Sequence, residues 1–221
     1  MVAYPDHIRF AFRTERLVFR ALEDNDADKN FVFELNNDPV CTAMSSMTVL
    51  RPVATSTYQK FANFANNCQL LSIACLPPLA KGGDEDGKEL ADTNTRVSPR
   101  DVTIAQVKDT TPIGFVCIMD ETSRHRRGTL GIGILEPFTG KGYGREMINW
   151  ALDWGFRSAN LHRIDLQTWG NNANALKLYR SLGFVEEGVE REAVVFDRKF
   201  IDVIRFGMLE GEWEKLRGIT T

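Results

Sequence analysis

Long apolar runs and an excess of charge of one sign are missing from this 221-residue sequence. No run approaches the roughly 20 apolar residues that span a bilayer, and residues 1–16 lack the continuous apolar stretch of a secretory signal. The 27 Lys and Arg against 30 Asp and Glu leave a net charge of −3, which is no electrostatic footprint for nucleic acid or an anionic membrane. We therefore expect a cytoplasmic protein, with the nucleus as the other possible address.

The cysteines also lack the spacing of a metal site. Cys41, Cys68, Cys75 and Cys117 are scattered without a C-x-x-C pair, and the three histidines do not cluster with them. Cys75 and Cys117 lie in apolar runs, where a thiol behaves as a small hydrophobic side chain. We expect structural cysteines and no metal, with a reactive thiol as the other reading.

The pattern of apolar residues predicts a mixed α/β sheet in a single domain over residues 10–215. Strands are expected at 16–22, 70–76, 102–107, 113–119, 130–135 and 163–169, and a closing hairpin at 184–196 and 200–209 through Asp197-Arg198. A first helix is expected at 24–38, capped by Asp24 or Asp26 and ended by Pro39, and a second is expected to follow a capping box at Ser56–Gln59. Two more helices are expected at 142–159 and at 174–182. Residues 79–101 are rich in Gly, Asp and Glu, so we expect a flexible insertion there.

A glycine-rich loop follows the strand at 130–135. Thr139–Gly144 holds three glycines and leads directly into a long amphipathic helix, with Lys141 and Arg145 adding positive charge. Glycine lets the main chain approach a ligand, and a helix start presents unpaired N–H groups that suit phosphate. The Walker and dinucleotide motifs both fail, because Gly142 stands where the first needs Ser or Thr and Arg145 where the second needs glycine. The residues predict a pyrophosphate cradle, with a plain strand-to-helix turn as the alternative.

A second motif follows about 30 residues later, after the strand at 163–169. It consists of Asn172, Ala175, Tyr179, Gly183 and Phe184. Together the two segments resemble the cofactor-binding and closing motifs of the GNAT superfamily of acyl-CoA-dependent N-acyltransferases. The segments Thr14–Arg20 and Glu187–Glu192, with Asp202 and Glu212-Trp213, resemble its ribosomal-protein-alanine and spermidine acetyltransferase branch. Thr139 departs from the family's Gln or Arg, so we expect a weaker or rearranged contact there.

The resemblance implies a mostly antiparallel central sheet with flanking helices, in which strands 4 and 5 splay to admit acetyl-CoA as co-substrate. The implied cofactor-binding residues are Ile134, Leu135 and Glu136 along the strand edge, Thr139, Gly140, Lys141, Gly142, Tyr143, Gly144 and Arg145 in the loop, and Asn172 and Tyr179 across the cleft. The implied chemistry is direct attack of an amine on the thioester. The acceptor stays open between a protein N-terminus, a polyamine and another small amine, and no nucleic acid or membrane partner is expected.

Proton transfer defines the candidate catalytic residues. The leaving thiolate has a conjugate acid of pKa roughly 8–9, so a nearby hydroxyl can protonate it, and the resemblance implies that Tyr179 does so. Glu136 is a candidate base or a solvated charge at the strand end, and a water relay needs no base at all. Glu34 and Asp38 could line an acceptor groove or be exposed helix charges.

Several other sequence features are compatible with two interpretations. The segment His125–Arg127 could touch an acidic substrate or the adenosine phosphate, or form a solvated hairpin turn. Trp150 and Trp154 fit core anchors better than ligand contacts. The competing function is a non-catalytic acyl-CoA sensor or scaffold of the same fold. The acidic insertion could recruit a basic peptide, and both a monomer and a homodimer are compatible with the sequence.

Overall fold

The computed structural model describes residues 5–45, 50–80 and 95–219. Within these ranges the chain forms a seven-stranded sheet in the order β1-β2-β3-β4-β5-β7-β6, and only the β4–β5 pair is parallel. The strands are β1 (Val18–Arg20), β2 (Cys68–Leu76), β3 (Thr111–Thr122), β4 (Arg127–Ile134), β5 (Arg163–Trp169), β6 (Val185–Phe196) and β7 (Lys199–Leu209). The predicted mixed, mostly antiparallel sheet is confirmed.

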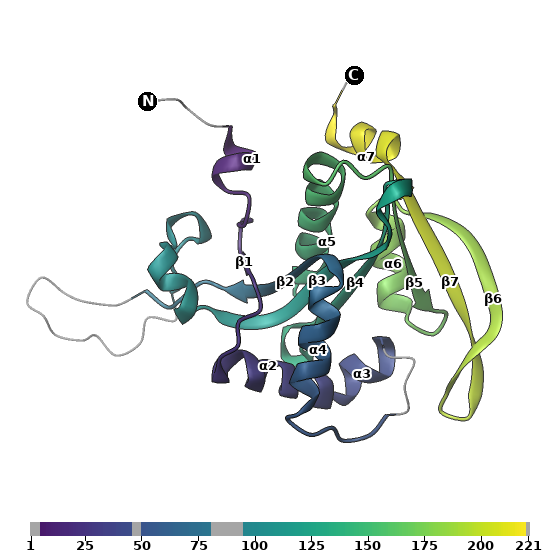
Figure 1. Cartoon of the computed structure of the whole chain (residues 1–221). Coiled ribbons are helices and arrows are strands. Elements are labelled where there is room, and N and C mark those ends of the chain that lie inside the picture. The colour runs from purple at the N-terminus through teal and green to yellow at the C-terminus, as the bar shows by residue number, and fades with distance from the viewer. Residues whose placement is uncertain (1–4, 46–49, 81–94, 220–221) are drawn as a thin grey trace, which may run out of the picture.

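Helices lie on both sides of this sheet (Figure 1). They are α1 (Asp6–Arg9), α2 (Asp26–Asn37), α3 (Pro39–Ser45), α4 (Thr57–Asn66), α5 (Tyr143–Asp153), α6 (Ala173–Ser181) and α7 (Glu210–Arg217). Strand β2 shows how both faces are covered, because successive side chains point to opposite faces. Ala74 and Leu76 pack in the core that includes α5 and α6, whereas Ile73 and Cys75 pack in the core that includes α2. Burial on both faces explains the continuous apolar run of this strand.

Helix α2 begins at a different cap from the predicted one. Asn25 is the N-cap, and its side chain accepts a hydrogen bond from the main-chain N of Asp28 at 2.8 Å. The prediction of Asp24 or Asp26 was wrong, because Asp26 is already helical and Asp24 pairs with Lys29. Asn is as good a cap as Asp, so composition alone did not separate these neighbours.

The strand predicted at 102–107 is wrong. Residues Ile104–Asp109 form a 3₁₀ helix, at whose start the side-chain oxygen of Gln106 accepts hydrogen bonds from the main-chain N and the hydroxyl of Thr103. The Ile104 side chain is 90% exposed. This apolar segment is not paired with a strand in the described part of the chain, and it satisfies its main-chain groups locally as a 3₁₀ helix.

Two helix boundaries also differ from expectation. Helix α4 forms, but the Ser56 side chain makes no capping bond and Gln59 donates to Asn63 instead, so the predicted capping box is absent. Helix α5 ends at Asp153 and continues as a π-helical turn over Trp154–Ser158. Gly155 in that turn packs so close to the side chain of Ile164 that a Cβ would lie 2.6 Å from it.

The closing hairpin forms as predicted. Asp197 and Arg198 connect β6 and β7 with φ of 47° and 62°, which are the left-handed values of a tight hairpin turn. The expected insertion at 79–101 falls largely on residues 81–94, outside the described residues. Its described ends are joined by an antiparallel bridge between Leu79 and Arg96.

Candidate active site

Strand β4 presents a free edge where the sheet splits. It pairs with β5 only over Arg127–Thr129, yet it continues to Ile134. In Figure 1 the two strands meet near α7 and separate toward α6. The main-chain N of Leu135 donates to the carbonyl of Ile113 in β3 at 3.0 Å. Because main-chain groups alternate in direction along an antiparallel strand, those of Ile132 and Ile134 face the gap beside β5. The splayed strands that we predicted are present.

The glycine loop ends at the start of α5 and leaves its first amides available. Gly140 and Gly142 have φ of 71° and 83°, the left-handed region that favours glycine. Gly142 is the N-cap and supplies no side-chain acceptor. A Cβ on Gly140 would meet nothing within 4 Å, so this side of the loop is open. Unpaired N–H groups at the positive end of a helix dipole suit a diphosphate.

The charged side chains of the loop have defined neighbours. The Arg145 guanidinium donates to the Ser181 hydroxyl at 2.5 Å and so connects the start of α5 to the end of α6. The Lys141 ammonium lies 5.7 Å from the centre of the Phe138 ring. The Thr139 hydroxyl donates to the carbonyl of Glu136 at 2.9 Å, which closes the turn after β4. Thr139 thus supports the loop from within.

Helix α6 carries the second motif. The Asn172 side-chain oxygen accepts a hydrogen bond from the main-chain N of Ala175 at 3.1 Å, so this residue caps the helix. Tyr179 is 7% exposed and packs its ring against Phe184 and Phe206, with ring centres 6.0 and 5.8 Å away. Burial raises the pKa of the Tyr179 phenol to about 12. The hydroxyl is therefore protonated throughout the neutral range and has a proton to donate.

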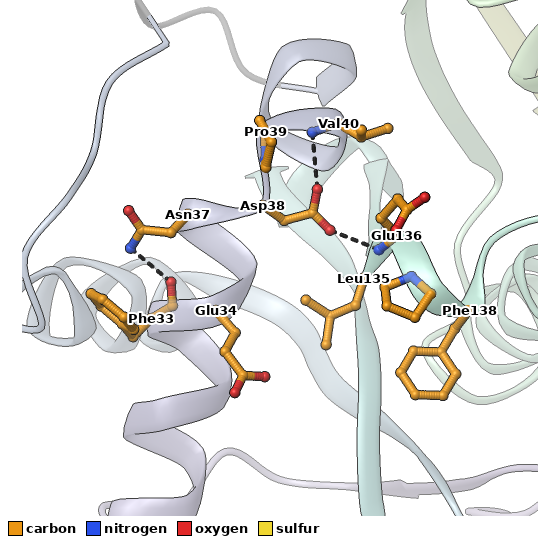
Figure 2. A pocket seen from close by; sticks show the side chains of 10 residues that line it. Phe33, Glu34, Asn37, Asp38, Pro39, Val40, Leu135, Glu136 and Phe138 are labelled. Carbon is orange, nitrogen blue, oxygen red and sulfur yellow. Dashed lines mark hydrogen bonds between the residues drawn. The ribbon is translucent and has the colours of Figure 1, made fainter.

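A cleft of about 510 Å³ adjoins the end of β4. Figure 2 shows side chains of α2 on one side of it and those of Leu135, Glu136 and Phe138 on the other. The lining consists of Phe33, Glu34, Asn37, Asp38, Pro39, Val40, Leu135, Glu136, Pro137 and Phe138. Three of these residues are acidic and none is Lys or Arg. The cleft therefore combines an apolar wall with negative charge, which fits a cation with an aliphatic chain.

Asp38 joins the two walls of this cleft. Its Oδ2 accepts from the main-chain N of Glu136 at 2.7 Å and its Oδ1 from the main-chain N of Val40 at 2.9 Å (Figure 2). The same Oδ1 also accepts from the main-chain N of Cys41 at 2.9 Å. Both oxygens are thus engaged by amides. Among the described residues, no hydrogen bond or ion pair reaches the carboxylates of Glu34 and Glu136, and both side chains are exposed.

The remaining sequence candidates lie away from the cleft. The Arg126 guanidinium donates to Asn160 and pairs with Glu210, so this polar turn is tied to the start of β5 and α7. Trp150 stacks on Phe19 with ring centres 3.8 Å apart and donates its indole N–H to the carbonyl of Ala11. These contacts make Trp150 a core anchor, as the sequence suggested.

The structure brings the end of β4, the glycine loop and the acidic cleft into one continuous region. No local sequence pattern could show that Glu34 and Asp38 lie across the cleft from Glu136, because about 100 residues separate them in the chain. In the described part of the chain, no hydrogen bond joins Glu136 to Tyr179. Sequence reasoning missed Phe33 and Phe138 in the lining, and their ordinary helix and turn contexts carried no signal for it.

Within the described residues, neither a membrane-spanning helix nor a metal-binding cluster is found. None of the helices in those ranges combines the length and apolarity needed to cross a bilayer. Nor do three or more His, Cys, Asp or Glu side chains in those ranges converge on a point that could hold a metal ion.

Curated proteins are similar to this chain in sequence. A spermidine N(1)-acetyltransferase of Vibrio cholerae is 37% identical over 101 residues, which are 46% of this chain and 58% of that protein. An uncharacterized N-acetyltransferase of Bacillus subtilis, YoaA, is 26% identical over 181 residues, or 81% of this chain and 85% of that protein. The chain spans about half to two thirds of the length of the first curated relatives that it matches.

A solved structure agrees over a longer stretch. The crystal structure of spermidine N-acetyltransferase from Vibrio cholerae in complex with CoA and spermine superposes with a TM-score of 0.64 and 25% identity, covering 90% of this chain and 98% of that one. The sequence profile of the acetyltransferase (GNAT) family matches residues 64–184, more than half of the chain. On these grounds the chain belongs to the acetyltransferase (GNAT) family.

Proposed function

We propose that the protein is an acetyl-CoA-dependent N-acetyltransferase whose acceptor is a primary amine of a polyamine. The observation that carries this proposal is the charge of the cleft, where Glu34, Asp38 and Glu136 face an otherwise mostly apolar lining. A polyamine alternates ammonium groups with methylene chains and so matches both parts of the lining. The similarity to a spermidine acetyltransferase supports the same acceptor class.

The donor occupies the gap between β4 and β5 in this proposal. The pantetheine arm pairs with the free edge of β4 at Ile134 and passes Leu135 and Glu136. The diphosphate lies on the loop at Gly140–Arg145, where the first amides of α5 point. Asn172 and Tyr179 flank the arm from the α6 side. The acetyl group then lies near Glu136, the residue that the strand end and the cleft share.

The reaction requires two proton movements. The amine nitrogen attacks the thioester carbonyl carbon, the C–S bond breaks, and the nitrogen loses a proton. Tyr179 donates its hydroxyl proton to the leaving thiolate and regains one from solvent. Glu136 accepts the amine proton directly or through water, since its exposed carboxylate has no hydrogen-bond partner among the described residues. One acetylated amine and one free thiol form for each acetyl-CoA consumed.

The cleft has opposite effects on the two ends of the acceptor. Nearby carboxylates stabilise ammonium groups and so favour binding of those that do not react. The reacting amine must be neutral, and an alkylamine of pKa near 10 is only about 0.1% neutral at pH 7. Leu135 and Phe138 form an apolar wall beside Glu136, and burial there lowers the pKa of an ammonium group. We therefore expect activity to rise between pH 7 and pH 9.

The test is a thiol-release assay with acetyl-CoA and matched acceptors. Spermidine, spermine, a peptide with a free N-terminus and a monoamine are compared, and the product is identified by mass. The expected result is that both polyamines are acetylated with a kcat/KM at least about tenfold above that of the monoamine, because two or more charges meet the carboxylates. Preference for the peptide would overturn the acceptor. Tight CoA binding without turnover of any amine would identify a sensor and overturn the enzyme.

A further inference from the structure

The segment that precedes β1 contacts the glycine loop and the first turn of α5. In the first turn of α5, Glu146 accepts hydrogen bonds at Oε1 from the Thr14 hydroxyl at 2.6 Å and from the main-chain N of Arg16 at 2.8 Å. Its Oε2 pairs with the Arg16 Nε at 2.8 Å. Residues some 130 positions apart therefore meet at the start of α5.

Arg16 also contacts the loop itself. Its Nη1 donates to the carbonyl of Lys141 at 2.9 Å, and its guanidinium carbon lies 4.7 Å from the centre of the Tyr143 ring. A Cβ on Gly142 would lie 3.4 Å from its Nη2. One guanidinium thus contacts Lys141 and Tyr143 and lies beside Gly142, while Glu146 holds it in place.

The bond to the Lys141 carbonyl fixes the direction of the next amide. The structure has no cis peptide among the described residues, and in a trans peptide the C=O and the following N–H point to opposite sides. Because the Lys141 carbonyl points at Arg16, the Gly142 N–H points away from it, to the other face of the loop. That amide is one of the donors offered to a diphosphate.

Glycine makes this peptide easy to rotate. Gly142 has φ of 83°, and without a Cβ it reaches the opposite rotation of the 141–142 peptide at little energetic cost. A rotated peptide would present a carbonyl oxygen to the phosphates and repel them. The same freedom that opens the loop to a ligand therefore requires a separate contact that keeps the amide outward.

We infer that Arg16 is a positioning residue for the donor: it holds the peptide between Lys141 and Gly142 so that the Gly142 N–H faces the diphosphate of CoA. Thr14 and Glu146 keep the guanidinium in that position. The inference rests on the proposed function, because it requires a diphosphate in the loop. It assigns a role in binding the acetyl donor to the segment Thr14–Arg16, none of whose residues lines the acidic cleft.

The experiment compares two donors on the same variants. Arg16→Gln is assayed with acetyl-CoA and with S-acetylpantetheine, which carries the thioester but no diphosphate. With acetyl-CoA, the KM is expected to rise about tenfold, the equivalent of one hydrogen bond to a charged group, while kcat and the KM for spermidine stay within about twofold. With S-acetylpantetheine, both constants are expected to match those of the wild type. Arg16→Lys keeps a charge beside Glu146 but cannot serve both acceptors, so a smaller rise is expected.

Arg126→Gln is the matched control. Arg126 is 46% exposed against 44% for Arg16, it also joins a carboxylate and a main-chain carbonyl, and it precedes the opposite end of β4. Its variant should leave the KM for both donors unchanged. An unchanged KM for acetyl-CoA in Arg16→Gln, an equal loss with both donors, or full wild-type behaviour of Arg16→Lys would overturn the inference. Failure of the wild type to bind CoA in calorimetry would instead refute the proposed function.

Discussion

Replacing Tyr179 by Phe separates the chemistry of this residue from its packing. Its burial raises the phenol pKa from 10.0 to about 12, a preference for the neutral form of about 3 kcal/mol. At pH 9 only about 0.1% of this phenol is ionised, so it remains a donor over the whole working range. The ring packs on Phe184 and Phe206, and no described residue accepts a hydrogen bond from its hydroxyl.

These facts set the expected magnitudes for Tyr179→Phe. The ring contacts persist and no internal hydrogen bond is lost, so the free energy of unfolding should change by less than about 1 kcal/mol. Loss of the proton donor should lower kcat about 100-fold, the lower end for acid catalysis, because a thiolate is a moderately good leaving group. The KM for acetyl-CoA should stay within about threefold, since the variant still fills the same space.

The assays are steady-state thiol release from about pH 6.5 to 10 and urea unfolding of both proteins from about pH 8 to 12. The wild type should show no alkaline loss of rate from Tyr179 up to about pH 10. Because its folded pKa lies above the unfolded value of about 10, the linked stability is present in full below pH 10 and is lost as the pH rises toward 12; the Phe variant should lack that loss. A variant that keeps more than about a third of the wild-type kcat at every pH would refute the acid role.

Three further changes test the cleft, the loop and the core. Glu34→Gln should raise the KM for spermidine about threefold and leave that of a monoamine unchanged in the same assay; an equal rise for both would contradict an electrostatic subsite. Gly142→Ala places a side chain at a φ of 83°, strained by about 1–2 kcal/mol, and should weaken CoA binding about tenfold by calorimetry, so unaltered affinity would count against the loop. Asp28 is fully buried and accepts two hydrogen bonds from Arg20, so Asp28→Asn should lower the urea-derived free energy of unfolding by about 3 kcal/mol, and a loss below about 1 kcal/mol would be inconsistent with this.

Local signals account for the parts of the fold that the sequence predicted well. The hairpin through Asp197-Arg198 and the passage from β4 through the glycines into α5 depend on backbone preferences of a few adjacent residues. Strand β5 was likewise predicted with the observed bounds, because polar and apolar residues alternate over 163–169 and Gly170-Asn171 follows as a turn signal. The motif with Asn172 placed α6 to within a residue, since its side chain caps that helix.

Other features depend on contacts that no local pattern encodes. The apolar residues at 102–107 matched a strand, yet within the described ranges no strand pairs with them, and only tertiary context decides that. Asn25, Asp24 and Asp26 are equivalent caps by composition, so the choice follows from where Asp28 meets Arg20. The acidic cleft and the contact of Arg16 with the loop both join segments about 100 residues or more apart. Such sites become visible only when the chain is folded.

The engagement of Asp38 affects how its variants must be interpreted. One carboxylate caps the start of α3 and also accepts from the amide that follows β4, so it connects the helical wall of the cleft to the end of the strand. In Asp38→Asn the carboxamide would turn an N–H toward one of those amides and break one of the two links. Diminished turnover in that variant would then report a displaced acceptor wall. Glu34, whose carboxylate has no hydrogen-bond partner among the described residues, is the position that tests the charge of the cleft without moving its scaffold or removing the proposed base.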